Sequence, residues 1–185
     1  MTLIGEVFVG DVIGKQVLDP VGEEIGRLHD IAVEGGGPFP RAAGLLLETK
    51  DKVLYLPWED LSIFNRRIIS SRKREEELGE FQPASDRLLI GKDVLDKQIV
   101  DIDGAKIVRV NDVKLTDEGG AACVPDVDVG VRGILRRLGV ERRGDAFFRA
   151  IRHPLKHQLI SWRFIQPLQP KLDRLTLSVS RQALS

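Results

Sequence analysis

Two pairs of aspartates have the spacing closest to a ligand set in this sequence. They are Asp101 and Asp103 in the motif DIDG, and Asp126 and Asp128 in the motif PDVD. Carboxylates are ligands that Mg²⁺ and Ca²⁺ prefer, so all four are candidate metal ligands. A calcium loop needs several more oxygens at set spacing, however, and DIDG offers two carboxylates. A turn capped by Asp101 is therefore favoured, and we expect no metal and no other cofactor.

Two histidines, His153 and His157, have the spacing of zinc ligands on a helix. Pro154 breaks that helical geometry, and no cysteine or third ligand stands nearby. The chain has no Ser-His-Asp or Cys-His motif, and the glycines at 35–37 lack the lysine and helix signal of a phosphate-binding loop. We therefore expect no enzyme activity and no small-molecule substrate.

The most unusual stretch is the basic segment from Val131 to His157, which holds eight Lys and Arg but two acidic residues. Five of its arginines are candidate partner-binding residues: Arg132, Arg136, Arg137, Arg142 and Arg143. An apolar stripe at helical spacing stands opposite the first three: Val131, Ile134, Leu135 and Leu138. Three roles stay open. The segment covers the adjacent domain, docks another domain or a second copy of the chain, or touches an anionic surface of membrane lipid or RNA.

Charge is divided unevenly along the chain, although the formal net charge of the 185 residues is zero. Residues 1–130 hold 16 Lys and Arg against 25 Asp and Glu, a net of −9. Residues 131–185 hold 12 against 3, a net of +9. Such a division indicates an electrostatic partner or self-association.

The composition is typical of a globular protein in a reducing compartment. Hydrophobic residues make up 42% of the chain and charged residues 30%. The longest apolar run, Ala42 to Leu47, is too short to span a membrane, and the N-terminus lacks the basic region of a signal peptide. The one cysteine, Cys123, allows no internal disulfide and is expected to be buried. We expect a cytoplasmic protein, associated with a membrane only through sequence beyond this chain.

The chain contains an internal repeat with an offset of 82 residues. The segment from Val12 to Val33 aligns without a gap with the segment from Val94 to Leu115, and eight of 22 positions are identical. A second match, LYLPWEDL with LISWRFIQPL, aligns Trp58 with Trp162. The offset there is 104, so the second copy carries about 22 extra residues, for which the basic segment is the natural candidate.

Short strands and tight turns are expected in both copies. An Asp-x-x-Gly turn stands at Asp19 to Gly22 and again at Asp101 to Gly104, where Asp caps the turn and Gly takes a positive φ. A hairpin is expected from residues 42–49 and 52–56, and Pro57 marks a strand end. The charged stretch 71–81 is expected to be a helix or linker, and 175–180 alternates as a strand. Asp30 and Asp112, equivalent in the repeat, are expected to cap a turn or pair with a strand arginine.

This pattern predicts a mainly β fold with two small tandem barrels. The first barrel spans 1–80, a linker spans 81–87, and the second barrel spans 88–180 with a short α-helical insertion at 131–157. Residues 181–185 then begin a following segment.

The residues of the first copy resemble the PRC-barrel domain. IGKQVLDPVGEEIGRLHDI at 13–31 and LPW at 56–58 are similar to its usual marks. That domain is named for the photosynthetic reaction centre H subunit and also forms the C-terminal half of the ribosome maturation factor RimM. The second copy, with VDVGVRGILRRLG at 127–139, is similar to the N-terminal region of bacterial proteins related to the magnesium transporter MgtE.

The resemblance implies a non-catalytic regulatory or assembly module of the cytoplasm. It would form the N-terminal part of an MgtE-like, magnesium-transport-related protein and contact the other domains of that protein. The alternative is a RimM-like adaptor that binds RNA or a ribonucleoprotein.

The basic segment gives a prediction about its own attachment. If its apolar stripe docks on the second barrel, Leu135→Asp undocks it, because each fully buried aliphatic side chain contributes roughly 1.5–3 kcal/mol. Arg136→Ala should hardly change the stability, because exposed ion pairs contribute about 0.2–1 kcal/mol. Thermal melts of the two variants compare these effects, and equal, small changes would mean that the stripe is not buried.

Overall fold

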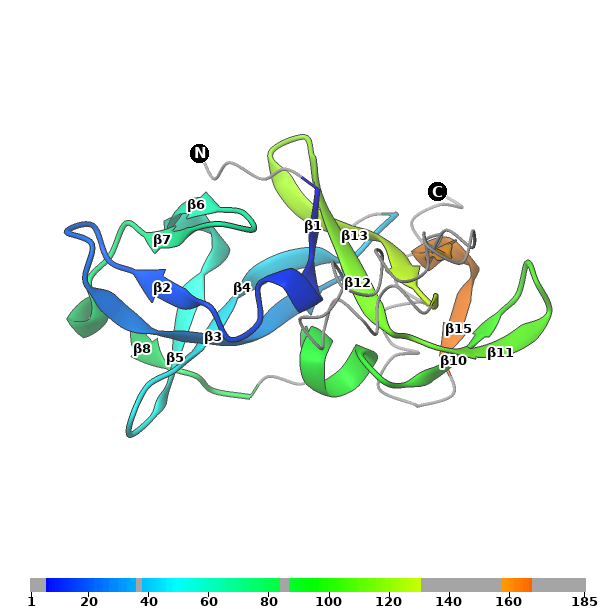
Figure 1. The fold of residues 1–185 in the computed structure, drawn as a ribbon, viewed down its shortest axis with the longest axis horizontal. Helices are drawn as coiled ribbons and strands as arrows, with labels where there is room; N and C mark the ends of the chain where they lie inside the picture. The colour runs from blue at the N-terminus through cyan, green and yellow to red at the C-terminus, as the bar shows by residue number, and fades with distance from the viewer. Residues whose placement is uncertain (1–5, 36–37, 84–86, 131–157, 168–185) are drawn as a thin grey trace, which may run out of the picture.

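The computed structural model describes residues 6–35, 38–83, 87–130 and 158–167 (Figure 1). The fold is mainly β, as the sequence predicts. The first part of the chain forms eight strands, β1 (Val7–Phe8), β2 (Gln16–Leu18), β3 (Glu24–Glu34), β4 (Arg41–Glu48), β5 (Val53–Pro57), β6 (Leu61–Phe64), β7 (Ile69–Ser71) and β8 (Gly79–Glu80). The second part forms β9 (Arg87–Leu89), β10 (Gln98–Asp101), β11 (Lys106–Arg109), β12 (Asp112–Glu118), β13 (Ala121–Asp128), β14 (Leu159–Ser161) and β15 (Ile165–Pro167).

Among the described residues, five short helical turns lie between the strands. They are η1 (Val9–Asp11), η2 (Trp58–Asp60), η3 (Glu75–Glu77), the wider π-type turn η4 (Ile90–Val94) and η5 (Trp162–Phe164). The expected helical insertion at 131–157, with its five candidate arginines, lies outside the described residues, and so do the strand at 175–180 and the segment 181–185.

Twelve of the strands form one sheet that curls into a half-barrel, with the central order β1-β12-β13-β4-β3-β2-β7-β6. The remaining three strands form a smaller sheet in the order β11-β10-β15. The larger sheet crosses the expected linker at 81–87, because β1 pairs with β12, β9 with β3, and β13 with β4. A tandem of two closed barrels is therefore not confirmed by this topology.

The turn predicted at Asp19 is confirmed. One carboxylate oxygen of Asp19 accepts hydrogen bonds from the N–H groups of Val21 and Glu23, at 2.8 and 2.9 Å. Gly22 has a φ of +90°, which a residue with a side chain rarely adopts. The turn brings β3 back against β2, and the two strands pair in antiparallel register.

The second copy of the turn differs in one respect. Asp101 accepts a hydrogen bond from the N–H of Gly104 at 3.0 Å, as expected for a capping aspartate. The positive φ falls on Ala105, at 47°, and not on Gly104. Gly104 is instead suited to a close approach, because a Cβ there would lie 2.5 Å from the Asp101 carboxylate. The prediction for the backbone of Gly104 was wrong.

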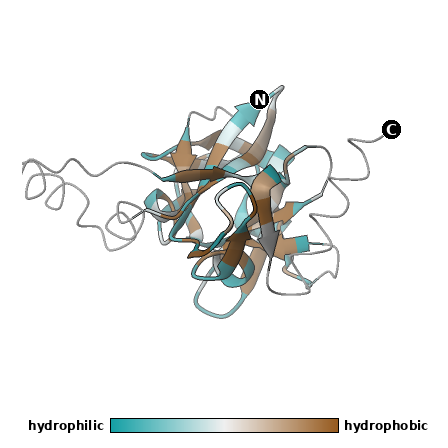
Figure 2. Cartoon of the chain, turned by 90° about the vertical axis from the view of Figure 1, so that its right-hand side faces the viewer, coloured by the Kyte–Doolittle hydropathy of each residue, from teal (hydrophilic) through white to brown (hydrophobic). Residues whose placement is uncertain are grey.

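The hairpin predicted through residues 50–51 is confirmed as β4 and β5, and Pro57 is the last residue of β5. Strand β4 is paired along both edges, with β3 and β5, and is buried continuously from Gly44 to Leu47, so both of its faces are covered there. The buried apolar side chains of both parts of the chain form a single core. Figure 2 shows the hydrophobic stretches on the strands and the hydrophilic ones on the turns.

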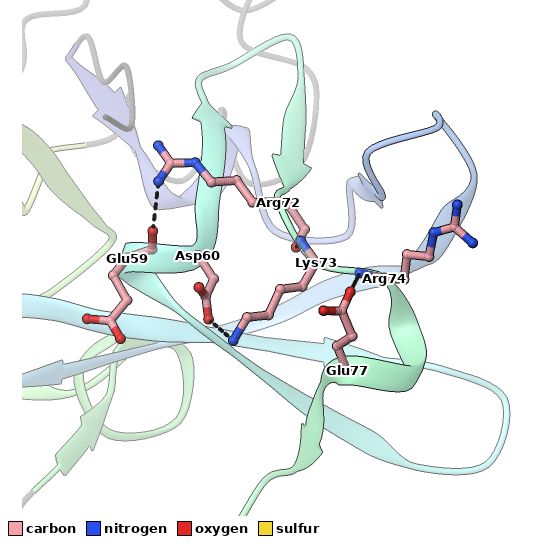
Figure 3. A network of polar contacts seen from close by, with 7 residues as sticks. Glu59, Asp60, Arg72, Lys73, Arg74 and Glu77 are labelled. Carbon is pink, nitrogen blue, oxygen red and sulfur yellow. Dashed lines mark hydrogen bonds and ion pairs between the residues drawn. The ribbon is translucent and has the colours of Figure 1, made fainter.

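The charged stretch 71–81 forms the end of β7, the single turn η3 and β8, rather than a longer helix. Figure 3 shows how it is fastened to η2. The Lys73 ammonium lies 2.8 Å from the Asp60 carboxylate, and the Arg72 guanidinium donates to the Glu59 carbonyl at 3.3 Å. The contact with Asp60 raises the pKa of Lys73. These polar contacts hold a segment that also contributes the buried side chain of Leu78.

One glycine in β3, Gly26, shows how tightly β3 packs against the end of β4. A Cβ at Gly26 would lie 2.7 Å from the carbonyl oxygen of Glu48, a backbone atom that cannot turn away. We expect Gly26→Ala to lower the free energy of unfolding by about 1–3 kcal/mol. Gly79→Ala is the control, since nothing lies within 4 Å of a Cβ there, and it should be neutral or stabilising by at most about 1 kcal/mol. Urea denaturation measures both, and equal midpoints would contradict the packing.

Candidate functional site

Three of the four candidate metal ligands line one surface cavity of about 560 Å³, namely Asp101, Asp103 and Asp126. Lys106 lines the same cavity, with its ammonium 3.9 Å from Asp101. The Lys114 ammonium lies 3.7 Å from Asp126. These lysines supply the positive charge that a cation would bring.

The fourth candidate, Asp128, is fully buried and accepts a hydrogen bond from the N–H of Gly130 at 2.8 Å. It is not among the residues that line the cavity. Among the residues that the structure describes, no group of three or more His, Cys, Asp or Glu could hold a metal ion. Asp101 and Asp128 thus accept main-chain hydrogen bonds, and Asp126 pairs with Lys114.

Asp30 caps a turn, as the sequence predicts, but that turn lies in the second part of the chain. Its carboxylate accepts hydrogen bonds from the N–H groups of Gly91 at 2.6 Å and Lys92 at 3.0 Å, which belong to η4, 61 and 62 residues further along the chain. A third bond comes from the N–H of Ile31 at 2.7 Å. Burial raises the pKa of Asp30, and the three N–H donors act against that rise. The carboxylate therefore caps the distant turn η4 and fastens it to β3.

Asp112, in the second part of the chain, makes the matching contact with a turn of the first part. Its carboxylate accepts a hydrogen bond from the N–H of Gly10 in η1 at 2.9 Å, and another from the N–H of Val113 at 2.8 Å. It is fully buried. The sequence correctly marked Asp30 and Asp112 as equivalent, and the expected turn cap is confirmed, although each aspartate caps a turn in the other part of the chain.

Three single residues behave as their sequence suggests. Trp58 and Trp162 are both buried, and each begins a short helical turn that follows a strand. Cys123 is buried and unpaired, and burial raises the pKa of its thiol. A raised thiol pKa disfavours the thiolate at neutral pH.

The smaller sheet has one buried face and one open face. Ile99 and Ile165 belong to the buried face. Because side chains alternate along a strand, Val100 and its cross-strand partner Ile107 point to the opposite side. Ile107 is 62% exposed there.

Two further apolar residues extend this open face where β10 ends. Ile102 is 52% exposed and Phe164 is 43% exposed. The N–H of Ile102 donates to the carbonyl of Phe164 at 3.0 Å, so the two lie side by side. We call Ile102, Ile107 and Phe164 the open face of the smaller sheet. Exposed apolar residues gathered in one region mark an interaction site more often than scattered apolar residues do.

The repeat did not reveal this surface. Ile107 aligns with Ile25, which is 4% exposed. In the first part of the chain Ile25 lies beside the β4–β5 turn and Glu75. The described residues of the second part provide no such cover for Ile107. Identical residues at equivalent positions therefore have different surroundings, which no local pattern reports.

A second cavity, also about 560 Å³, lies where the two parts of the chain meet. Its lining includes Tyr55 and Trp58 from the first part of the chain and Arg87, Gly120 and Ala121 from the second. The Arg87 guanidinium lies over the Tyr55 ring at 5.2 Å and its Nε is 3.7 Å from Glu34. These mutual contacts stabilise the junction, and the sequence analysis did not identify them.

The curled sheet and its main-chain caps define a mainly β module. Residues 4–76 match the PRC-barrel domain, so a PRC-barrel domain is found in the first part of this chain. No curated protein matches the sequence significantly. In the ranges that the structure describes, no helix is long and apolar enough to cross a membrane.

The pair Ile25 and Ile107 gives a direct test of the open face. Ile25→Ala should lower the free energy of unfolding by about 2–5 kcal/mol, because it removes buried apolar atoms and leaves a cavity. Ile107→Ala should change it by no more than about 0.5 kcal/mol, because the side chain is mostly in solvent. Urea denaturation of both variants measures the difference. Equal losses would show that Ile107 is covered within the chain.

Proposed function

We propose that the chain is a non-catalytic assembly module that binds a partner protein through the open face of its smaller sheet. The observation that carries this proposal is the exposure of Ile107, whose equivalent Ile25 is buried. Leaving an aliphatic side chain of this size in water forgoes roughly 1.5–3 kcal/mol of burial energy, which a partner can recover.

The edge of the sheet supports a partner that binds as an extended strand. Strand β11 lies at the end of the order β11-β10-β15, and its one pairing among the described strands is with β10. A partner strand can therefore hydrogen-bond along the free edge and place an apolar side chain over Ile107. Arg109 shares the face of Ile107 and is exposed, and it forms an ion pair with Asp96 of the same chain at 3.0 Å.

A tandem duplication of the PRC-barrel domain is the finer part of this proposal, and strand registers support it. Asp30 pairs with Leu46, and at an offset of 82 Asp112 pairs with Asp128. The next strand pairs in the same way at the second offset of 104, since Leu46 pairs with Tyr55 and Asp128 with Leu159. These matches extend beyond the segment in which the two sequences are similar.

The placement within a larger protein remains a prediction from the sequence resemblance. An MgtE-like protein would supply the partner as a further domain of the same polypeptide. The residues encoded after Ser185 test this placement directly. The RimM-like alternative depends on Arg132, Arg136 and their neighbours, which lie outside the described residues. A cytoplasmic location is likewise a proposal.

Site-specific photo-cross-linking in the cells that produce the protein tests the docking face. A photoreactive residue replaces Ile107 in one variant and Val21 in the control, because Val21 is 61% exposed in a turn of the first part. We expect position 107 to cross-link to one defined protein segment, mapped by mass spectrometry, that position 21 does not reach. Adding Phe164→Lys should reduce that cross-link at least about fivefold, because a buried charge opposes apolar docking.

Three results would contradict the proposal. Position 107 would cross-link to other residues of the same chain, to lipid or nucleic acid, or to the same background as position 21. The first result would mean that the chain covers its own open face, and the second would favour an anionic surface as the partner.

A further inference from the structure

The first strand of each half of the chain completes the sheet of the other half. Here the halves are residues 6–83 and 87–167, and β1 and β9 are their first strands. β1 pairs with β12 of the second half, with Val7 opposite Leu115. β9 pairs with β3 of the first half, with Leu89 opposite Ala32. At the repeat offset of 82 these two pairings agree to within one residue, so the exchange is reciprocal.

Equivalent aspartates hold both exchanged strands. The N–H of Lys92 donates to Asp30, and the N–H of Gly10, which aligns with Lys92, donates to Asp112. Each carboxylate reaches across to the turn that follows the first strand of the other half. Gly91 allows the close approach on one side, because a Cβ there would lie 2.9 Å from the Asp30 carboxylate.

The contact between β4 and β13 has the symmetry that this exchange requires. Arg41 faces Cys123, and the difference between their numbers is the repeat offset of 82. A residue that faces its own equivalent across an antiparallel pair lies on a two-fold axis, as at the centre of an isologous dimer interface. The N–H of Val124 donates to the carbonyl of Pro40 at 2.9 Å, which continues the pairing next to this point.

We infer that the two halves form a strand-exchanged pair about a pseudo-two-fold axis through Arg41 and Cys123. Each repeat has an edge at which it can bind the first strand of another repeat, and in this chain that edge is occupied by the other half. This inference rests on the proposed duplication, but not on the proposed partner protein. The partner that this edge of a repeat accepts is another copy of the repeat. That copy provides a strand of two or three residues, followed by a turn whose N–H groups bind the carboxylate.

Exchange of this kind makes each half depend on the other. Breaking a carboxylate contact should loosen the first strand and turn of the other half, while in its own half the change should be limited to Ile31 or Val113, whose N–H the carboxylate also binds. Two separately folded domains packed side by side would show the opposite, because each aspartate would then act within its own domain.

Hydrogen exchange of the full chain, followed by mass spectrometry, separates these cases. In Asp30→Ala we expect amide exchange to rise about tenfold at 87–94, and in Asp112→Ala at 7–11. Asp19→Ala is the control, because Asp19 caps its own turn, so its effect should stay within 19–23. Increases confined to the half that contains each substitution would overturn the inference. If an alanine variant unfolds, Asp30→Asn and Asp112→Asn are measured instead.

A second variant tests the axis without removing any buried group. The bond from Val124 to Pro40 makes Arg41 and Cys123 a narrow, non-hydrogen-bonded pair, whose side chains lie close. Arg41→Cys should therefore form a disulfide with the native Cys123 on oxidation at mildly alkaline pH, and the product should be a monomer. Free thiols, or a disulfide-linked dimer, would overturn the exchange within one chain. Both results are independent of cross-linking from Ile107, so failure of the docking proposal leaves this inference intact.

Discussion

Two buried carboxylates, Asp30 and Asp112, hold main-chain N–H groups that lie far away in the sequence, and the rest of the structure depends on these contacts. A buried carboxylate without hydrogen-bond donors costs several kcal/mol, and the N–H groups at the start of a turn have no partner of their own. Each contact satisfies both needs at once. It also places β1 or β9 along the edge of a long strand, so that the two halves share one sheet. Removing either side of the contact leaves a buried polar group on the other.

The shared sheet explains why the chain has a single apolar core. β3 is paired along one edge with β4 and along the other with β2 and β9, and its second part is buried on every side from Asp30 to Val33. β4 lies between β3 and β13, next to the point where Arg41 faces Cys123. The strands with the most buried side chains are therefore the ones that connect the two halves. A core arranged in this way cannot divide at the expected linker without exposing the central strands.

The two halves have similar strand registers but different surroundings. The first half covers Ile25 with its β4–β5 turn and with a charged segment that the contact between Lys73 and Asp60 fastens in place. The second half carries the basic segment after Gly130 where the first half has a short turn, and its smaller sheet presents Ile102, Ile107 and Phe164 to solvent. Duplication preserves the pairing that builds the sheet, and the connections between strands are free to change. Function is therefore expected where the halves differ.

The sequence alone determined the local features of this protein. The repeat, the turn at Asp19, the β4–β5 hairpin with Pro57 at its end and the burial of Trp58 follow from spacing and side-chain chemistry within a few residues. The sequence also marked Asp30 and Asp112 as equivalent, yet their partners are 62 and 102 residues away, beyond the reach of any local pattern. Only the tertiary structure decided which strands pair across the two halves and left Ile107 in solvent while Ile25 is buried. The physical reason is that turns and hairpins are set by neighbouring residues, whereas edge pairing and burial depend on which distant segment arrives to cover a surface.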